Sequence, residues 1–112
     1  MGSLRVLGIY RAFMMYKVEE NARYGDILNW IYEIVKDEVR GGDKMSDEEV
    51  AIRFQLTTLS DGLDVDEFEA FMEEFLKKAR IMLSHMNEDD VQTIINVHHR
   101  CLEIIKKCME KK

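Results

Sequence analysis

The sequence predicts an all-α fold, a single compact bundle of about five helices, and three observations support this. The chain of 112 residues contains no proline, and its apolar residues recur at the helical spacing of about 3.6 residues. No segment shows the alternating β-branched pattern of a strand. A chain of this length buries enough surface to fold without disulfides or a metal. We therefore expect residues 1–112 to form one helical domain.

The first half of the chain predicts two helices separated by a turn. The first runs from about Leu4–Asn21, with Ser3 as its N-cap, and its apolar residues occupy more than one face. Gly25-Asp26 predicts a break and a new cap, after which the second helix covers about Ile27–Arg40. The following pair of glycines, Gly41-Gly42, indicates a loop.

The third helix is predicted from a capping box, in which Ser46 accepts the amide of Glu49 and the Glu49 side chain reaches back. We expect this helix to run to about Ser60 and to end at Gly62 in a left-handed conformation. The residues expected to face inward are Ile52, Leu56 and Leu59.

Two more helices complete the bundle. Asp64 is expected to begin the fourth helix, where acidic side chains favour the helix dipole. Its apolar stripe comprises Phe68, Phe71, Phe75, Ala79 and Met82. The fifth helix is expected over Asn87–Glu110. Because the connecting loops are short, sequential helices are expected to lie antiparallel.

The fifth helix has the most regular apolar pattern. Two rows of residues repeat at intervals of seven. The first row is Val91, His98 and Ile105, and the second row is Ile94, Cys101 and Cys108. The pattern fits a core helix of the bundle, and three heptads are short for a coiled coil. The alternative is a homodimer seam, in which His98, Cys101 and Ile105 contact a second copy.

The two cysteines indicate the compartment. Cys101 and Cys108 would lie about 10 Å apart along one helix, which is too far for a disulfide between them. Two unpaired thiols fit a reducing compartment, so we expect a cytoplasmic protein. A structural zinc site needs a second pair of ligands from another segment, and none is visible. We expect no metal and no cofactor.

Charge and hydropathy exclude several functional classes. The net charge of −6 argues against nucleic-acid binding, and no apolar run is long enough to span a membrane. Residues 37–74 hold thirteen acidic and three basic residues, a balance of −10. This segment predicts either a surface for a basic partner or helix N-termini that collect acidic residues.

Arg80 and His85 have the spacing of Arg, four residues, then His. This spacing resembles the motif of the small helical HEPN ribonucleases. The resemblance implies that Arg80 would hold a phosphate and His85 would act as acid or base. Ile81 departs from the polar residue that the family usually carries after the Arg.

A second resemblance covers about a quarter of the chain. The stretch Ile34–Leu63, with its paired glycines and its Ser60-Asp61-Gly62-Leu63 end, resembles part of the ligand-binding half of TetR-type repressors. The DNA-binding half of that family has no counterpart here. The resemblance implies a dimeric helical sensor of a ligand.

We expect the chain to be a small interaction or regulatory module that binds a protein partner or itself, because no catalytic constellation stands out. Eight methionines, including Met14 and Met15, supply the adaptable apolar surface that partner binding uses. The alternatives are the ligand-sensing dimer and the ribonuclease.

Overall fold

The structure, a computed structural model, describes residues 2–57 and 62–110, with side chains from Leu4 onward. Helices account for most of the described chain, as the sequence predicts. They are α1 (Gly2–Glu20), a short 3-10 turn η1 (Ala22–Tyr24), α2 (Gly25–Val39), α3 (Asp47–Gln55), α4 (Val65–Met82) and α5 (Glu88–Glu110). No strand occurs in the described ranges. The predicted bundle of about five helices is confirmed.

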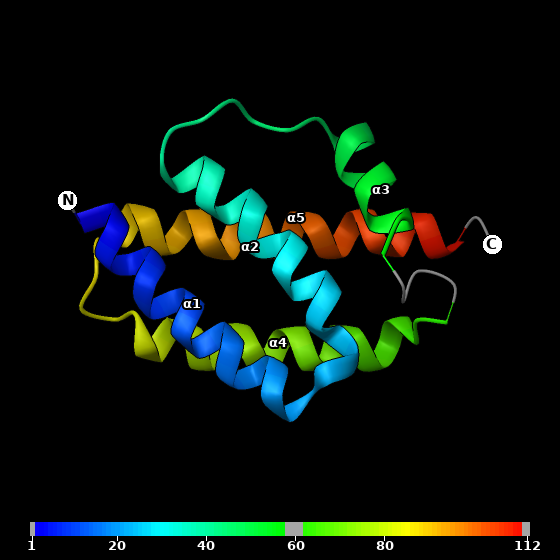
Figure 1. Cartoon of the computed structure of the whole chain (residues 1–112), viewed down its shortest axis with the longest axis horizontal. Coiled ribbons are helices and arrows are strands. Elements are labelled where there is room, and N and C mark those ends of the chain that lie inside the picture. The colour runs from blue at the N-terminus through cyan, green and yellow to red at the C-terminus, as the bar shows by residue number, and fades with distance from the viewer. Residues whose placement is uncertain (1, 58–61, 111–112) are drawn as a thin grey trace.

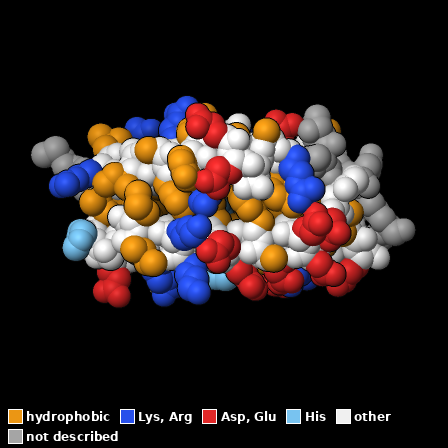
Figure 2. All heavy atoms as spheres, turned by 90° about the horizontal axis from the view of Figure 1, so that it is seen from below, with side chains coloured by type: hydrophobic (Ala, Val, Ile, Leu, Met, Phe, Trp, Pro, Cys, Tyr) orange, Lys and Arg blue, Asp and Glu red, His pale blue; other side chains and the backbone are white. Residues whose placement is uncertain are grey.

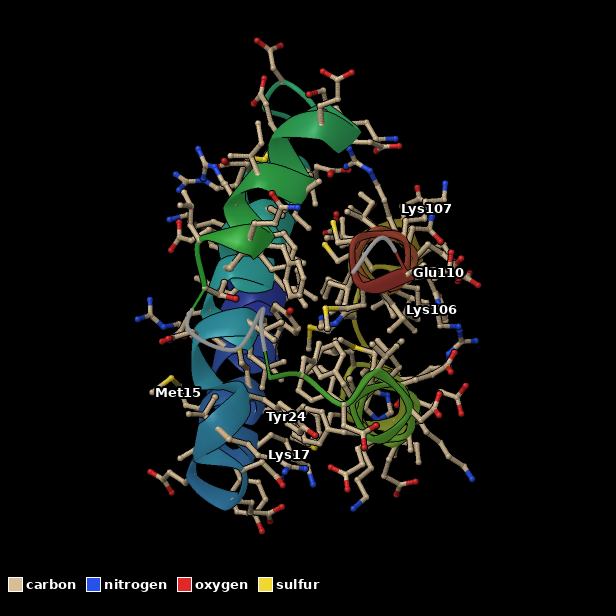
Figure 3. All side chains as sticks on the ribbon, turned by 90° about the vertical axis from the view of Figure 1, so that its right-hand side faces the viewer. Met15, Lys17, Tyr24, Lys106, Lys107 and Glu110 are labelled. Atoms are coloured by element: carbon tan, nitrogen blue, oxygen red, sulfur yellow. The ribbon has the colours of Figure 1, made fainter. Side chains whose placement is uncertain are left out.

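The helices form two layers (Figures 1 and 3). α1, α2 and α3 lie in one layer, and the long helices α4 and α5 lie in the other. The principal-axis extents of 42 × 31 × 17 Å match a body two helices thick. One apolar core between the layers draws side chains from all five helices.

Three of the predicted helix starts are confirmed by their caps. The side chains of Ser46, Asp64 and Asn87 each accept a hydrogen bond from the backbone N–H three residues later, at 3.2, 3.1 and 3.1 Å. Each bond satisfies an amide that has no partner within the helix. These caps act locally, which is why the sequence alone locates them.

The turn between α1 and α2 differs from the prediction. The break falls at Asn21, after which η1 leads directly into α2, and Gly25 lies inside α2 with right-handed helical angles. A Cβ at Gly25 would stand 3.3 Å from a methyl carbon of Val18, so the glycine lets α2 approach α1 closely. α1 begins before Ser3, so Ser3 is not its N-cap.

α2 ends in the predicted pair of glycines. Gly41 adopts a left-handed φ of +80°, and its N–H bonds to the carbonyl of Glu38 at 3.1 Å. The N–H of Gly42 bonds to the carbonyl of Asp37 at 2.8 Å. These two bonds form a Schellman motif, which satisfies carbonyls that the ending helix leaves unpaired.

α3 is shorter than predicted, and its inner face was assigned wrongly. It ends at Gln55 rather than near Ser60, well before Gly62. Ile52 and Leu56 are 58% and 80% exposed, whereas Val50 and Phe54 are fully buried. The helix is rotated so that Phe54 enters the core, which turns the row containing Ile52 and Leu56 to solvent. The predicted inner residue Leu59 lies outside the described ranges.

The stripe of α4 is largely as predicted. Phe68, Phe75 and Ala79 are buried and Phe71 is half-buried. Met82 was expected inside but is 51% exposed, because Leu83 takes the inward position where the helix ends.

α5 packs as a core helix. His98, Cys101 and Ile105 are at most 1% exposed within a single chain. Most of the face that carries the two heptad rows therefore contacts the chain's own helices.

Part of the acidic segment 37–74 is used for internal contacts. Arg100 of α5 pairs with Glu38 at 3.2 Å and Asp47 at 2.9 Å, and its guanidinium also donates to the carbonyl of Met45. Lys106 pairs with Glu69 on α4. In Figure 2, acidic side chains gather at the end where α4 begins, and apolar ones gather toward the opposite end. Helix starts and ion pairs thus explain much of the acidic balance.

No helix in the described ranges is both long enough and apolar enough to cross a membrane.

Candidate binding grooves

The predicted site residues fall into three places. His98, Cys101 and Ile105 lie in the core, as already described. Met14 and Met15 line a groove on the layer of α1, α2 and α3. Arg80 lines a second groove, between α4 and α5. His85 lines neither of these two grooves and is exposed beyond the end of α4.

His98 is a satisfied core residue. Its Nε2 lies 2.6 Å from the Tyr10 hydroxyl, and its Nδ1 lies 3.0 Å from the Met72 sulfur. Because a thioether sulfur can only accept, Nδ1 carries the hydrogen and Nε2 accepts from Tyr10. Burial lowers the pKa of His98 to about 3, with a smaller contribution from nearby His99. The imidazole is therefore neutral at physiological pH.

The two cysteines are free and buried. Burial raises the pKa of the Cys101 thiol to about 12. Because the thiolate is the reactive form, this thiol is a poor nucleophile at neutral pH. Among the described residues, no three His, Cys, Asp or Glu side chains gather in a way that could hold a metal ion.

The first groove, which we call the Trp30 groove, has a volume of about 470 Å³ and joins α1, α2 and α3. Its lining residues are Arg11, Met14, Met15, Asn29, Trp30, Tyr32, Glu33 and Arg53. Met15 is 45% exposed on the outer side of its layer, where Figure 3 labels it, whereas Met14 is almost completely buried. The two predicted methionines thus form the apolar wall of one concave surface.

Trp30 is the most unusual residue of this groove. It is the only tryptophan of the chain and is 9% exposed, with its ring 6.1 Å from that of Phe54. Its indole N–H is buried and has no hydrogen-bond partner in the described part of the chain. An unpaired buried donor costs about 1–3 kcal/mol, so structures rarely leave one.

Two arginines stand beside the groove. Arg11 lies over the ring of Tyr32, with its guanidinium carbon 5.2 Å from the ring centroid. Arg53 on α3 has no ion pair within residues 2–57 and 62–110. The acidic residue of the lining, Glu33, is already paired with Lys36 at 2.9 Å. The groove therefore offers two cations and one unpaired donor.

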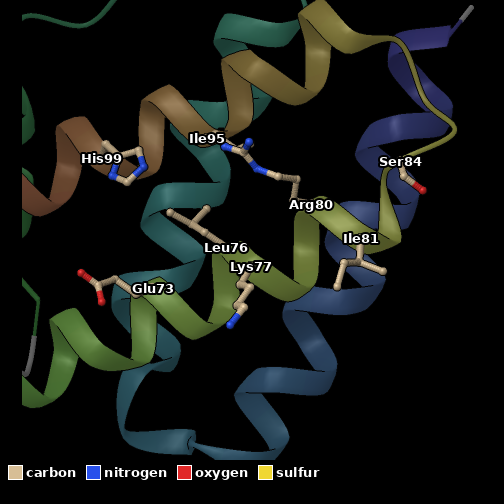
Figure 4. A pocket seen from close by; sticks show the side chains of 8 residues that line it. All are labelled: Glu73, Leu76, Lys77, Arg80, Ile81, Ser84, Ile95 and His99. Carbon is tan, nitrogen blue, oxygen red and sulfur yellow. The ribbon is translucent and has the colours of Figure 1, made fainter.

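The second groove, which we call the α4–α5 groove, has a volume of about 560 Å³. Its lining residues are Glu73, Leu76, Lys77, Arg80, Ile81, Ser84, Ile95 and His99. Figure 4 shows Arg80 reaching from α4 toward α5 beside Ile95. The histidine that shares this groove with Arg80 is His99, so the structure does not bring together the predicted pair of Arg80 and His85 here.

Sequence reasoning missed four of these residues. It did not single out Trp30, Arg11, Arg53 or His99. Both grooves form between segments that are distant along the chain, so no local motif marks them. The single tryptophan was the one signal in the sequence that could have drawn attention.

Comparison of the chain with protein-family models, with curated proteins and with solved structures gives no match. The resemblances to HEPN ribonucleases and TetR-type repressors stay predictions.

Proposed function

We propose that the chain is a small interaction module that binds an acidic segment of a partner protein in the Trp30 groove. The observation that carries the proposal is the buried indole N–H of Trp30, which has no partner in the described chain. A carbonyl or carboxylate of the bound segment would accept this hydrogen bond. Binding would then recover the cost of about 1–3 kcal/mol that the free protein bears.

The methionines explain how an acceptor reaches a covered N–H. The indole nitrogen is shielded from solvent, and Met14 and Met15 line the same groove. Methionine side chains are unbranched and change conformation at low cost, so the groove can open by side-chain movement alone. Met15, already 45% exposed, also supplies apolar contact area for the bound segment.

The charge of the groove selects an acidic segment. Arg11 and Arg53 line it, and Glu33 is held by Lys36. Each arginine can bind a carboxylate through two parallel N–H bonds. This local charge is opposite in sign to the net charge of −6 of the whole chain, so the rest of the surface repels the same segment.

A labelled peptide that alternates acidic and apolar residues tests the proposal by fluorescence anisotropy. We expect saturable binding that weakens about tenfold in Arg53→Gln and is unchanged in Arg40→Gln. Arg40 is an exposed arginine that does not line the groove. A peptide with lysines in place of the acidic residues should not bind. Equal binding of both peptides, or equal effects of the two variants, would contradict the proposal.

Trp30→Phe tests the hydrogen bond itself. Phenylalanine keeps an aromatic ring but has no N–H, so the variant should fold and bind the acidic peptide at least fivefold more weakly. If the variant binds the peptide as tightly as wild type, Trp30 does not donate to the partner.

Self-association through this groove is a second form of the same proposal. The acidic helix starts, such as Glu48 and Glu49 on α3, could supply the acidic segment from a second copy. A solution mass that rises with concentration and falls to that of a monomer in Arg53→Gln would support self-association.

We also propose a cytoplasmic location, supported by the two free thiols.

A further inference from the structure

The α4–α5 groove contains cations that the proposed function does not use. Lys77 and Arg80 lie three residues apart on α4 and therefore on one face of the helix. Neither has an ion pair among the described residues, although the adjacent Lys78 pairs with Glu74 at 3.6 Å. Arg80 reaches toward α5 while Lys77 points away from it (Figure 4), and Glu73 is the acidic side chain of the same lining. Two cations against one carboxylate leave the lining with a net positive charge on an acidic protein.

Apolar side chains form the floor and one wall of the same groove. Leu76 and Ile95 are nearly buried and close the floor between the two helices. Ile81 is 70% exposed on the wall, which is high for a large apolar residue in a helix of this bundle. A ligand that covers Ile81 would remove this apolar surface from water, at about 25 cal/mol for each Å².

The groove has the dimensions and the polarity of a small-molecule site. Its volume of about 560 Å³ lies within the range of about 300–1,000 Å³ that is typical of ligand pockets. The lining residues of α4 run from Glu73 to Ile81, about 12 Å at 1.5 Å per residue, and Ser84 follows just beyond the helix. Glu73 places a negative charge at one end, away from Arg80 (Figure 4). An anionic group is therefore attracted to the Arg80 region and repelled from the opposite end.

We propose that the α4–α5 groove binds a small amphiphilic monoanion, a carboxylate on an alkyl or aromatic body. The carboxylate binds Arg80, with Lys77 adding positive charge, and the body packs against Leu76, Ile81 and Ile95. Glu73 selects against a second anionic group, so a dicarboxylate of the same length binds more weakly. This site is independent of the Trp30 groove, because it uses other helices and other residues.

Octanoate is a suitable probe, and titration followed by amide chemical shifts locates where it binds. We expect saturable shifts at residues 76–84 and 95–99. Acetate carries only the anionic head, octan-1-ol only the apolar body, and octanedioate a second anionic group. Each should bind at least tenfold more weakly than octanoate. Equal affinity for octan-1-ol, or saturable shifts only around Trp30, would overturn the proposal.

Three variants test which residues bind the carboxylate of octanoate and which bind its alkyl chain. Arg80→Gln should raise the dissociation constant of octanoate about tenfold, and Ile81→Ser should raise it about threefold. Both side chains are exposed, so neither change should unfold the protein. Arg40→Gln removes a charge of the same kind outside the groove and should leave the constant unchanged. If Arg40→Gln weakens binding as much as Arg80→Gln does, octanoate responds to net charge and the site is refuted.

Discussion

α5 and α3 differ in how far their apolar residues are buried. α5 has 23 residues, and nine of them are buried in the core. α3 has nine residues and buries two, while its apolar Ile52 and the apolar Leu56 directly after it remain exposed. Both helices contact the same core, and each has an N-terminal cap, Ser46 for α3 and Asn87 for α5. Length makes the difference, because α5 buries one face along its whole length, whereas α3 is short enough to be held by its two buried residues, Val50 and Phe54.

The anchor of α3 is Phe54, and its link to α5 is Arg100. Phe54 is fully buried against Trp30, and Arg100 joins α5 to Glu38 and to Asp47 at the start of α3. A short helix held at two points can present a rotated face to solvent. The exposed apolar side chains of α3 and the neighbouring Trp30 groove follow from this arrangement.

The largest effect is expected at the anchor of α3. Phe54→Ala should lower the free energy of unfolding by about 3–5 kcal/mol, because a fully buried aromatic ring is removed and leaves a cavity. Phe75→Ala in α4, at 1% exposure, is the matched control and should cost a similar amount. Urea unfolding measures both. A cost below about 1 kcal/mol for Phe54→Ala alone would show that α3 is not anchored by this ring.

A matched pair of isoleucines, one in each helix, compares the burial of α5 and α3 directly. Ile105→Ala in α5 should cost about 2–5 kcal/mol, because Ile105 is fully buried. Ile52→Ala in α3 should change the free energy of unfolding by less than about 0.5 kcal/mol, because its side chain is 58% exposed. Similar costs for the two variants would mean that α3 has the rotation that the sequence predicted.

The link between the helices should contribute less. Arg100→Gln removes two ion pairs of a side chain that is 19% exposed, so we expect a cost of about 1–3 kcal/mol. The exposed Arg53→Gln serves as control and should stay within about 0.5 kcal/mol. If both variants unfold at the same urea concentration as wild type, the ion pairs do not hold α3 to α5.

The smallest effect concerns the pH dependence of α5. The pKa of His98 is about 3 in the folded protein and 6.5 as a free side chain, so the folded state binds fewer protons. The stabilisation is complete above a pH of about 6.5 and is lost as pH falls below it. Between pH 7.5 and 5.5 the wild type should lose about 1.4 kcal/mol more than His98→Leu. Equal losses would show that His98 is not buried in neutral form.

Several features could be predicted because they depend on neighbours within one helical turn. Ser46, Asp64 and Asn87 cap helices through amides three residues away, and Gly41 follows the end of α2. The apolar rows of α5 repeat often enough to define one inward face. The helical class and most of the buried faces of α4 and α5 therefore followed from the sequence alone.

The tertiary structure decided which side of a short or widely apolar helix faces inward and where a groove forms. α3 carries apolar residues on two sides, so its rotation depends on the space that Trp30 and the other helices leave for Phe54. The two grooves join residues from different helices, and Arg80 and His99 line one groove because α4 and α5 pack side by side. A local sequence pattern determines which conformations one segment favours. Which of these the segment adopts depends on the volume and polarity of the segments that pack against it, and these lie far along the chain.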